Sequence, residues 1–156
     1  PNPLLPAPTD ELLGHFRRAM DTLVPAARAA GTRLLVENMP FAFLPGAAEL
    51  MAALGSYTVE DAGVVYDIAN AWFHGEDLAE GFKTMAPRLA LVHVSDTPRD
   101  TYLHAPVGDG TLPFAESAAA CQAVGYDGPV MLEIICANPD RDIPASATAL
   151  RGMGWG

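Results

Sequence analysis

Residues 89–96 read Leu-Ala-Leu-Val-His-Val-Ser-Asp, an apolar run that passes directly into a histidine with an acid just beyond it. A short, almost uninterrupted apolar run is typical of a strand buried on both faces of a parallel sheet. The pattern occurs three more times in the chain, with Glu37 after 34–36, Asp67 after 64–66 and Glu133 after 130–132. Each run therefore predicts a strand that ends in a polar side chain able to bind a metal.

Helical stretches separate these four runs. Thr9 offers a hydroxyl cap followed by acids, Pro25 is expected to kink or split the first helix, and Gly31 is expected to end it. The proline-rich residues 1–8 are expected to form a loop or entry segment. Alternating strands and helices at a spacing of roughly thirty residues indicate βα units. We therefore predict an α/β fold with a parallel sheet in one domain over residues 1–156, with helices over 9–30, 47–54, 76–85, 114–124 and 145–151.

Composition excludes several classes of protein. Half of the 156 residues are hydrophobic, which argues against disorder, and the 9 basic against 19 acidic residues disfavour nucleic acid as a partner. The sequence has no apolar stretch long enough for a membrane span, and no signal peptide opens it. The only two cysteines, Cys121 and Cys136, form neither a disulfide framework nor a metal motif, so a reducing, cytoplasmic location is expected. The chain begins at Pro1 without a methionine, and we expect it to be part of something longer.

The polar residues at the strand ends carry the functional prediction. In parallel α/β folds the carboxyl ends of the strands form the edge where ligands bind. Three carboxylates converging beside one imidazole would repel each other unless a divalent cation lay among them. Three oxygen donors and one nitrogen donor suit manganese, magnesium, cobalt or zinc better than a thiophilic ion. Although a single acid after a strand is often a helix cap or a solvated turn, four at successive strands favour a shared site at Glu37, Asp67, His93 and Glu133.

Five phrases extend this pattern to a known family. The phrases are LLVENMP (34–40), VVYDIANAW (64–72), LVHVSD (91–96), HAPVGDGTLPF (104–114) and VMLEI (130–134). Together they resemble the xylose isomerase-like TIM-barrel superfamily, and within it the sugar phosphate isomerases and epimerases. The resemblance implies a (β/α)8 barrel of which this chain supplies about four βα units, strands five to eight.

The resemblance also implies roles for individual residues. One divalent metal, most often manganese, would be held by Glu37, Asp67, His93 and Glu133, and the two glutamates would act as the acid/base pair. Proton transfer through a metal-stabilised enediolate would then isomerise or epimerise a small sugar, sugar phosphate or keto-polyol. Arg99 would hold substrate oxygens. Asn70, where relatives carry a histidine, would hydrogen-bond the substrate, and His104 is expected to contact it or to anchor its loop.

Other readings remain open on the sequence alone. The same site could serve an inosose-type dehydratase, or a relative that binds sugar or metal without catalysis. A DNA repair enzyme resembling endonuclease IV is disfavoured, because Tyr102 and Asn70 replace an aspartate and a histidine that its three-zinc site needs, and because the chain is acidic. For the missing half of the barrel, we expect a longer chain first, with a homo-oligomer of half-barrels and a true truncation as alternatives.

Overall fold

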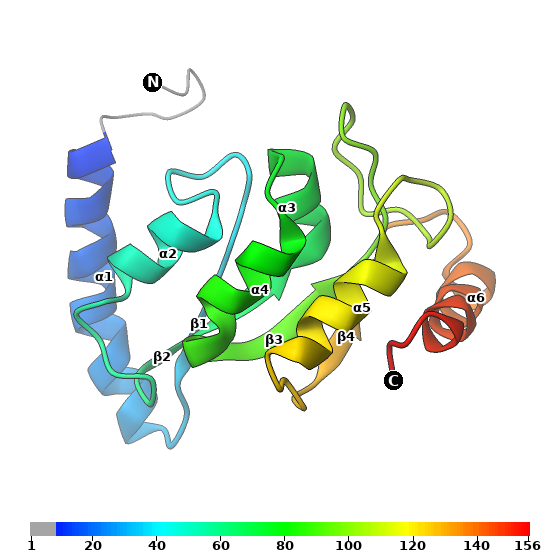
Figure 1. Ribbon diagram of the computed structural model, residues 1–156. Coiled ribbons are helices and arrows are strands. Elements are labelled where there is room, and N and C mark those ends of the chain that lie inside the picture. Colours follow the sequence, from blue (N-terminus) through cyan, green and yellow to red (C-terminus); the bar gives the residue numbers. More distant parts are fainter. Residues whose placement is uncertain (1–8) are drawn as a thin grey trace.

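A computed structural model describes residues 9–156, and the expected entry segment 1–8 lies outside the described residues (Figure 1). Strands and helices alternate through most of the chain, as the sequence predicts. The strands are β1 (Leu34–Glu37), β2 (Ala62–Asp67), β3 (Leu89–Val94) and β4 (Val130–Leu132). The helices are α1 (Thr9–Ala29), α2 (Ala47–Ala53), α3 (Ile68–His74), α4 (Leu78–Met85), α5 (Phe114–Ala123) and α6 (Pro139–Gly152), with a 3-10 turn, η1, at Ala86–Arg88.

The four strands form one parallel sheet in the order β1-β2-β3-β4, so each strand pairs with the next one along the chain. Parallel neighbours need a crossover connection, which the helices provide here. In this register Asp67 is paired with His93, and Glu37 is paired with Val65. The predicted α/β fold with a parallel sheet is confirmed, and the sheet brings the polar strand ends to one edge.

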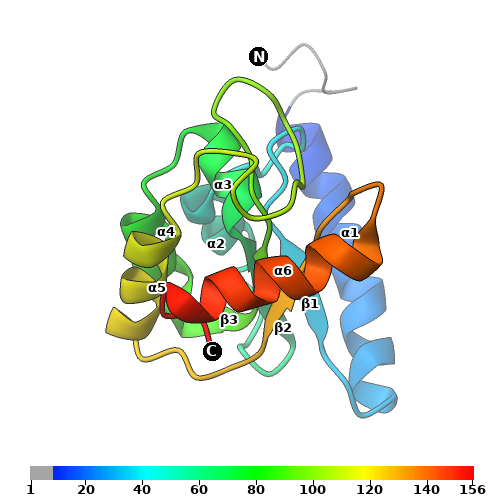
Figure 2. The same ribbon diagram turned by 90° about the vertical axis from the view of Figure 1, so that its right-hand side faces the viewer.

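Helices cover one face of the sheet. Figure 1 shows α2, α4 and α5 side by side in front of the strands, and Figure 2 shows the sheet from its side with these helices on one side of it. The core under them centres on Tyr66 of β2 and Phe82 of α4, whose buried rings meet edge to face with centroids 4.9 Å apart. The Tyr66 hydroxyl donates a hydrogen bond to Glu76 Oε2 at 3.1 Å, so the phenol is satisfied inside the core.

Side chains on the opposite face of the sheet are more exposed to solvent. Leu35 of β1 is 42% exposed and Met131 of β4 is 46% exposed. Both side chains lie on the same face as the acids that follow them two residues later, because alternate residues of a strand share a face. Apolar side chains therefore line the solvent-facing surface below the polar strand ends.

The helices differ from the sequence prediction in three places. α1 continues through Pro25 as one helix. Its buried residues lie on both sides of the proline, Met20 and Val24 before it and Ala27 after it, so both halves pack on the core. α3 was not predicted; it begins immediately after β2 because Asp67 Oδ1 accepts the backbone N–H of Asn70 and so caps the helix. α6 begins earlier than expected, at Pro139, because proline is well suited to the first turn of a helix. Over residues 9–156 none of the helices combines the length and the apolarity that a membrane span needs.

The close packing of α4 on β2 makes a testable prediction about stability. A Cβ at Gly81 would overlap the hydroxyl of the buried Tyr66. We expect Gly81→Ala to lower the free energy of unfolding by about 1–3 kcal/mol, measured by urea denaturation. Gly14→Ala in α1 is the matched control, because its new methyl group would meet only Arg18 Nη1 at 3.5 Å; it should raise stability by about 0.5–1 kcal/mol. Equal effects of the two changes would contradict this account of the α4–β2 contact.

Candidate metal centre

Four side chains from four successive strands meet at the carboxyl edge of the sheet. Glu37 and Asp67 are the last residues of β1 and β2, His93 lies in β3, and Glu133 follows β4. One nitrogen or oxygen atom of each lies within 4.8 Å of the corresponding atom of every other member. The structure thus brings together the four residues that the sequence singled out as a shared site.

His93 lies at the middle of this cluster. Its Nδ1 is 2.8 Å from Glu133 Oε2 and 3.4 Å from Glu37 Oε1. Despite the short distances, both ring nitrogens of His93, Glu133 Oε2 and Asp67 Oδ2 are buried without a hydrogen bond of good geometry. Buried polar atoms are nearly always hydrogen-bonded, so these exceptions make the cluster a candidate site for a ligand.

Burial and like charge act together on the carboxylates. Burial raises the pKa of Asp67, the Asn70 N–H opposes this, and the charges of Glu133 and Glu37 raise the pKa further. Burial also raises the pKa of Glu37, again with the help of Glu133, and His93 opposes the shift. The site therefore concentrates negative charge that costs free energy until a cation offsets it.

The ends of β1 and β2 are held together by a side chain that the sequence analysis did not single out. Asn38 accepts the backbone N–H of Asp67 on its Oδ1 at 2.8 Å and donates from Nδ2 to the Asp67 carbonyl at 3.0 Å. Asn38 is fully buried. This pair of hydrogen bonds fixes the separation between Glu37 and Asp67, the two acids at the ends of these strands.

Of the residues predicted to bind substrate, Asn70 and His104 lie at the cluster. Asn70 Nδ2 donates to the Asn38 carbonyl at 2.9 Å and to Glu37 Oε1 at 3.4 Å. His104 Nδ1 is 3.9 Å from both Asp67 Oδ2 and Glu133 Oε2, and 3.0 Å from Ser95 Oγ.

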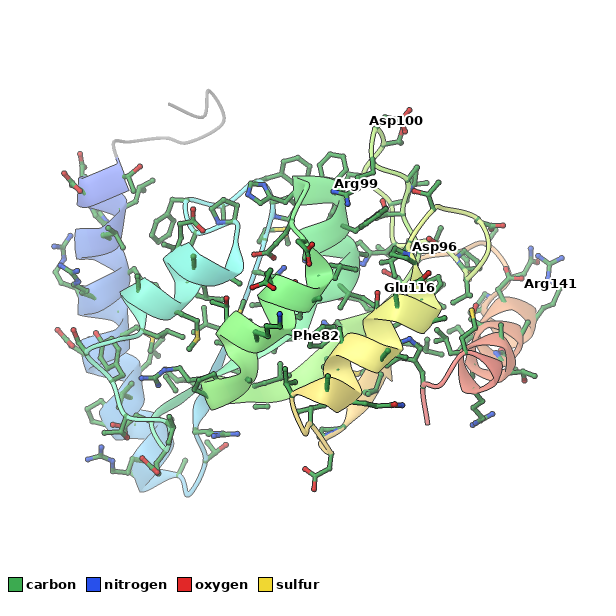
Figure 3. The ribbon with its side chains drawn as sticks, viewed as in Figure 1. Phe82, Asp96, Arg99, Asp100, Glu116 and Arg141 are labelled. Carbon is green, nitrogen blue, oxygen red and sulfur yellow. The ribbon has the colours of Figure 1, made fainter. Side chains whose placement is uncertain are left out.

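Arg99 lies elsewhere in the structure. Its guanidinium carbon stacks 3.3 Å from the centroid of the Trp72 ring, and Figure 3 shows it beside α3 on the loop that follows β3. This stacking is a cation–π contact with the helix. A substrate-binding role for Arg99 remains a prediction that would require the side chain to leave Trp72.

An aromatic cluster of Phe41, Phe73 and Tyr102 borders the site. The ring of Tyr102 lies 4.9 Å from that of Phe41 and 5.2 Å from that of Phe73. Burial raises the pKa of Tyr102 to about 12, and the charges of Asp67, Glu133 and Glu37 add to the shift. The phenol therefore stays protonated beside the acids.

The loop over the site is held by a buried acid that is not a member of the cluster. Asp96 accepts backbone N–H groups from Thr97, Gly108 and Leu112 at 2.8–3.1 Å, and Figure 3 labels it where this loop begins. A Cβ at Gly110 would overlap Asp96 Oδ1, which explains a glycine there. Asp96 thus shapes the segment that carries Tyr102 and His104.

The donor set fits one divalent cation. Three carboxylates and one imidazole match the hard or borderline ions Mn²⁺, Mg²⁺, Co²⁺ and Zn²⁺. Asp67, His93 and Glu133 each also offer a buried atom without a hydrogen bond. Glu37, Asp67, His93 and Glu133 are the residues that would hold it.

Comparisons with known proteins agree with this architecture. A D-tagatose 3-epimerase-like protein superposes with a TM-score of 0.79 at 22% identity, covering 92% of this chain and 54% of its own. A D-psicose 3-epimerase gives 0.79 at 19% identity, covering 97% and 60%. A probable 3-DHS dehydratase from Bacillus anthracis gives 0.71 at 16% identity, covering 85% and 55%. The chain thus spans little more than half the length of these structures, and identities this low establish the fold alone.

Sequence comparison supplies the family. No curated protein sequence matches the chain. The family profile described as xylose isomerase-like TIM barrel matches residues 2–155, nearly the whole chain. A four-stranded parallel sheet whose relatives are full barrels is a partial barrel. The chain therefore belongs to the xylose isomerase-like TIM-barrel family.

Proposed function

We propose that this chain carries the metal centre of a divalent-metal-dependent isomerase or epimerase, which acts on a small sugar, sugar phosphate or keto-polyol by proton transfer. The observation that carries the proposal is the convergence of Glu37, Asp67, His93 and Glu133, the last three of which have buried donor atoms that lack hydrogen bonds. The epimerases among the structural neighbours are consistent with it. Manganese is the proposed metal, and magnesium, cobalt and zinc are the alternatives.

The three acids of the cluster differ in how far their side chains are exposed to solvent, and this difference suggests different roles. The side chains of Glu37 and Glu133 are 32% and 41% exposed, whereas that of Asp67 is fully buried. Only the glutamates can reach a substrate in the open space above the sheet edge. Asp67 is therefore assigned to metal binding alone, and the two glutamates combine metal binding with acid/base chemistry.

The proposed reaction moves a proton at a carbon next to a carbonyl. When bound, the cation supplies electrophilic stabilisation of negative charge on substrate oxygens. Glu37 or Glu133 removes the proton from one face of the carbon, leaving an enediolate. The other glutamate returns a proton to the opposite face for epimerisation, or to the neighbouring carbon for isomerisation. His104 is proposed to contact the substrate, whereas the fully buried Asn70 is proposed to act through Glu37, to which its Nδ2 donates.

A dehydratase is the second candidate. One structural neighbour is described as a probable 3-DHS dehydratase. An enediolate formed by one of the two glutamates can lose the hydroxyl of the next carbon as water, with the other glutamate supplying its proton, instead of regaining a proton at carbon. A dehydrated product would identify the dehydratase, whereas a product with the same composition as the substrate would identify the isomerase or epimerase. A nucleic-acid substrate is disfavoured by the net charge of −10.

The metal site is tested first. Protein purified without chelator should contain about one equivalent of a divalent metal, measured by elemental mass spectrometry. The double variant Glu37→Gln/Glu133→Gln should lose it, because two of the donors then carry no charge. Glu116→Gln, the same change on the exposed face of α5, is the control and should keep the metal. Equal metal content in all three proteins would contradict the assignment.

The chemistry is tested by hydrogen exchange. A panel of ketoses and inososes is incubated with the metal-loaded protein in deuterated water, and incorporation at carbon is followed by NMR. Glu133→Gln should lower the exchange rate by about 10²-fold or more with an unchanged circular dichroism spectrum. Near-normal exchange in this variant would refute the role of Glu133, and binding without exchange in the wild type would indicate a binding protein.

The raised pKa values of Asp67 and Glu37 predict a pH-dependent metal affinity. The protonated form of each acid predominates below its raised pKa, and a metal must displace that proton. Lowering the pH from about 8 to about 6 should therefore weaken Mn²⁺ binding, with protons released on binding. Calorimetry in buffers of different ionisation enthalpy measures both effects. Asp67→Asn should weaken binding and flatten its pH dependence, whereas the surface change Asp100→Asn should leave both unaltered; an affinity independent of pH would contradict the prediction.

A further inference from the structure

Tyr102 connects the loop after β3 to the metal centre through its hydroxyl group. Tyr102 Oη lies 2.7 Å from Asn70 Oδ1 and 2.8 Å from His104 Nε2. The contacts of its ring with Phe41 and Phe73 hold the phenol in place from two sides. A third neighbour, Met39 Sδ at 3.7 Å, is only a weak acceptor. A tyrosine hydroxyl has one proton, so it can donate to only one of these atoms.

The partners of Asn70 decide the direction of these hydrogen bonds. Asn70 Nδ2 faces the Asn38 carbonyl at 2.9 Å, so this atom is the amide nitrogen and Oδ1 is the acceptor. Tyr102 must then donate to Asn70 Oδ1, and His104 Nε2 must carry a proton and donate to Tyr102. In a neutral imidazole His104 Nδ1 is consequently bare, and it accepts the Ser95 hydroxyl at 3.0 Å. The four residues form one directional chain from Ser95 through His104 and Tyr102 to Asn70.

Asn70 is also hydrogen-bonded to two acids of the site, so the orientation of its side chain affects them. Its backbone N–H donates to Asp67 Oδ1 at 2.6 Å, and its Nδ2 donates to Glu37 Oε1 at 3.4 Å. An amide donor stabilises a carboxylate without adding charge to a crowded site. If the Asn70 amide rotated, it would place an oxygen against Glu37 instead. While His104 Nε2–H donates to the Tyr102 hydroxyl, that hydroxyl donates to Asn70 Oδ1, and rotation of the amide would lose this hydrogen bond.

We propose that Tyr102 is a positioning residue, whose hydroxyl fixes the Asn70 amide against Glu37 and holds His104 as the Nε2-protonated tautomer. The proposal builds on the function proposed above, in which Glu37 is one of the acid/base pair. Tyr102 acts through Asn70, so it should influence the rate of proton transfer more than the binding of substrate. Its hydroxyl, not its ring, carries the effect.

The first test needs no substrate. Histidine ring ¹⁵N NMR distinguishes the Nε2–H form, the Nδ1–H form and the imidazolium, so it reports the tautomer of His104 directly. We expect the Nε2–H form in the wild type and a mixture of tautomers in Tyr102→Phe, where Nε2–H has lost its acceptor. The side-chain amide protons of Asn70 should exchange faster with water in the variant. A wild-type Nδ1–H tautomer, or identical spectra in the two proteins, would overturn the proposal.

The second test measures proton transfer. In the deuterium-exchange assay Tyr102→Phe should lower kcat about tenfold and change KM by less than about twofold, because the ring and the pocket remain. Tyr126→Phe is the matched control: it also removes one hydroxyl that donates to a carbonyl, that of Pro129 at 2.8 Å, at the opposite end of β4. It should leave the tautomer, kcat and KM unchanged.

The outcomes separate this proposal from the function on which it rests. A loss confined to KM, or an unchanged kcat in Tyr102→Phe, refutes the positioning role while the enzyme remains an isomerase. A wild-type protein that exchanges no substrate refutes the proposed function. In that case the NMR comparison still decides whether Tyr102 fixes Asn70 and His104.

Discussion

The carboxylate of Asp67 is fully buried at the carboxyl edge of the sheet, and the rest of the site can be understood from that constraint. A buried charge is costly unless it is paired or bound to a metal. Oδ1 is satisfied by the Asn70 N–H, whereas Oδ2 has no hydrogen bond and faces two further acids and a histidine. Such an arrangement is stable either with protons on the acids or with a cation among them, and a divalent cation offsets the charge of several acids at once.

The strands and the four donors could be predicted because both follow from local patterns. Apolar runs predict the strands, and in a parallel sheet the carboxyl ends of the strands lie at the same edge. A polar residue at each of these ends is therefore a member of one cluster. Helix α3 escaped prediction because Asp67 has two roles, ending β2 and capping the next helix with no loop between them. A strand that passes directly into a helix leaves none of the turn residues that usually mark a boundary.

The supporting residues could not be predicted, because their partners lie far away in the chain. Asn38 is hydrogen-bonded to Asp67, 29 positions later, and Tyr102 to Asn70, 32 positions earlier. No local periodicity encodes such pairs. The stacking of Arg99 on the Trp72 ring could not be predicted from the sequence either, and the substrate contact that the family resemblance implies for Arg99 stays a prediction.

The positions of the four candidate donors do not depend on the exposed face of the sheet. The four donors lie at the ends of consecutive strands, and contacts between neighbouring strands set their spacing. Asn38 is hydrogen-bonded to the backbone of Asp67, and Asp67 is paired with His93. The Glu133 N–H donates to the Val94 carbonyl at 3.0 Å. None of these contacts depends on the exposed face that carries Leu35 and Met131. Groups that cover that face in a full barrel can therefore vary without disturbing the positions of the four donors.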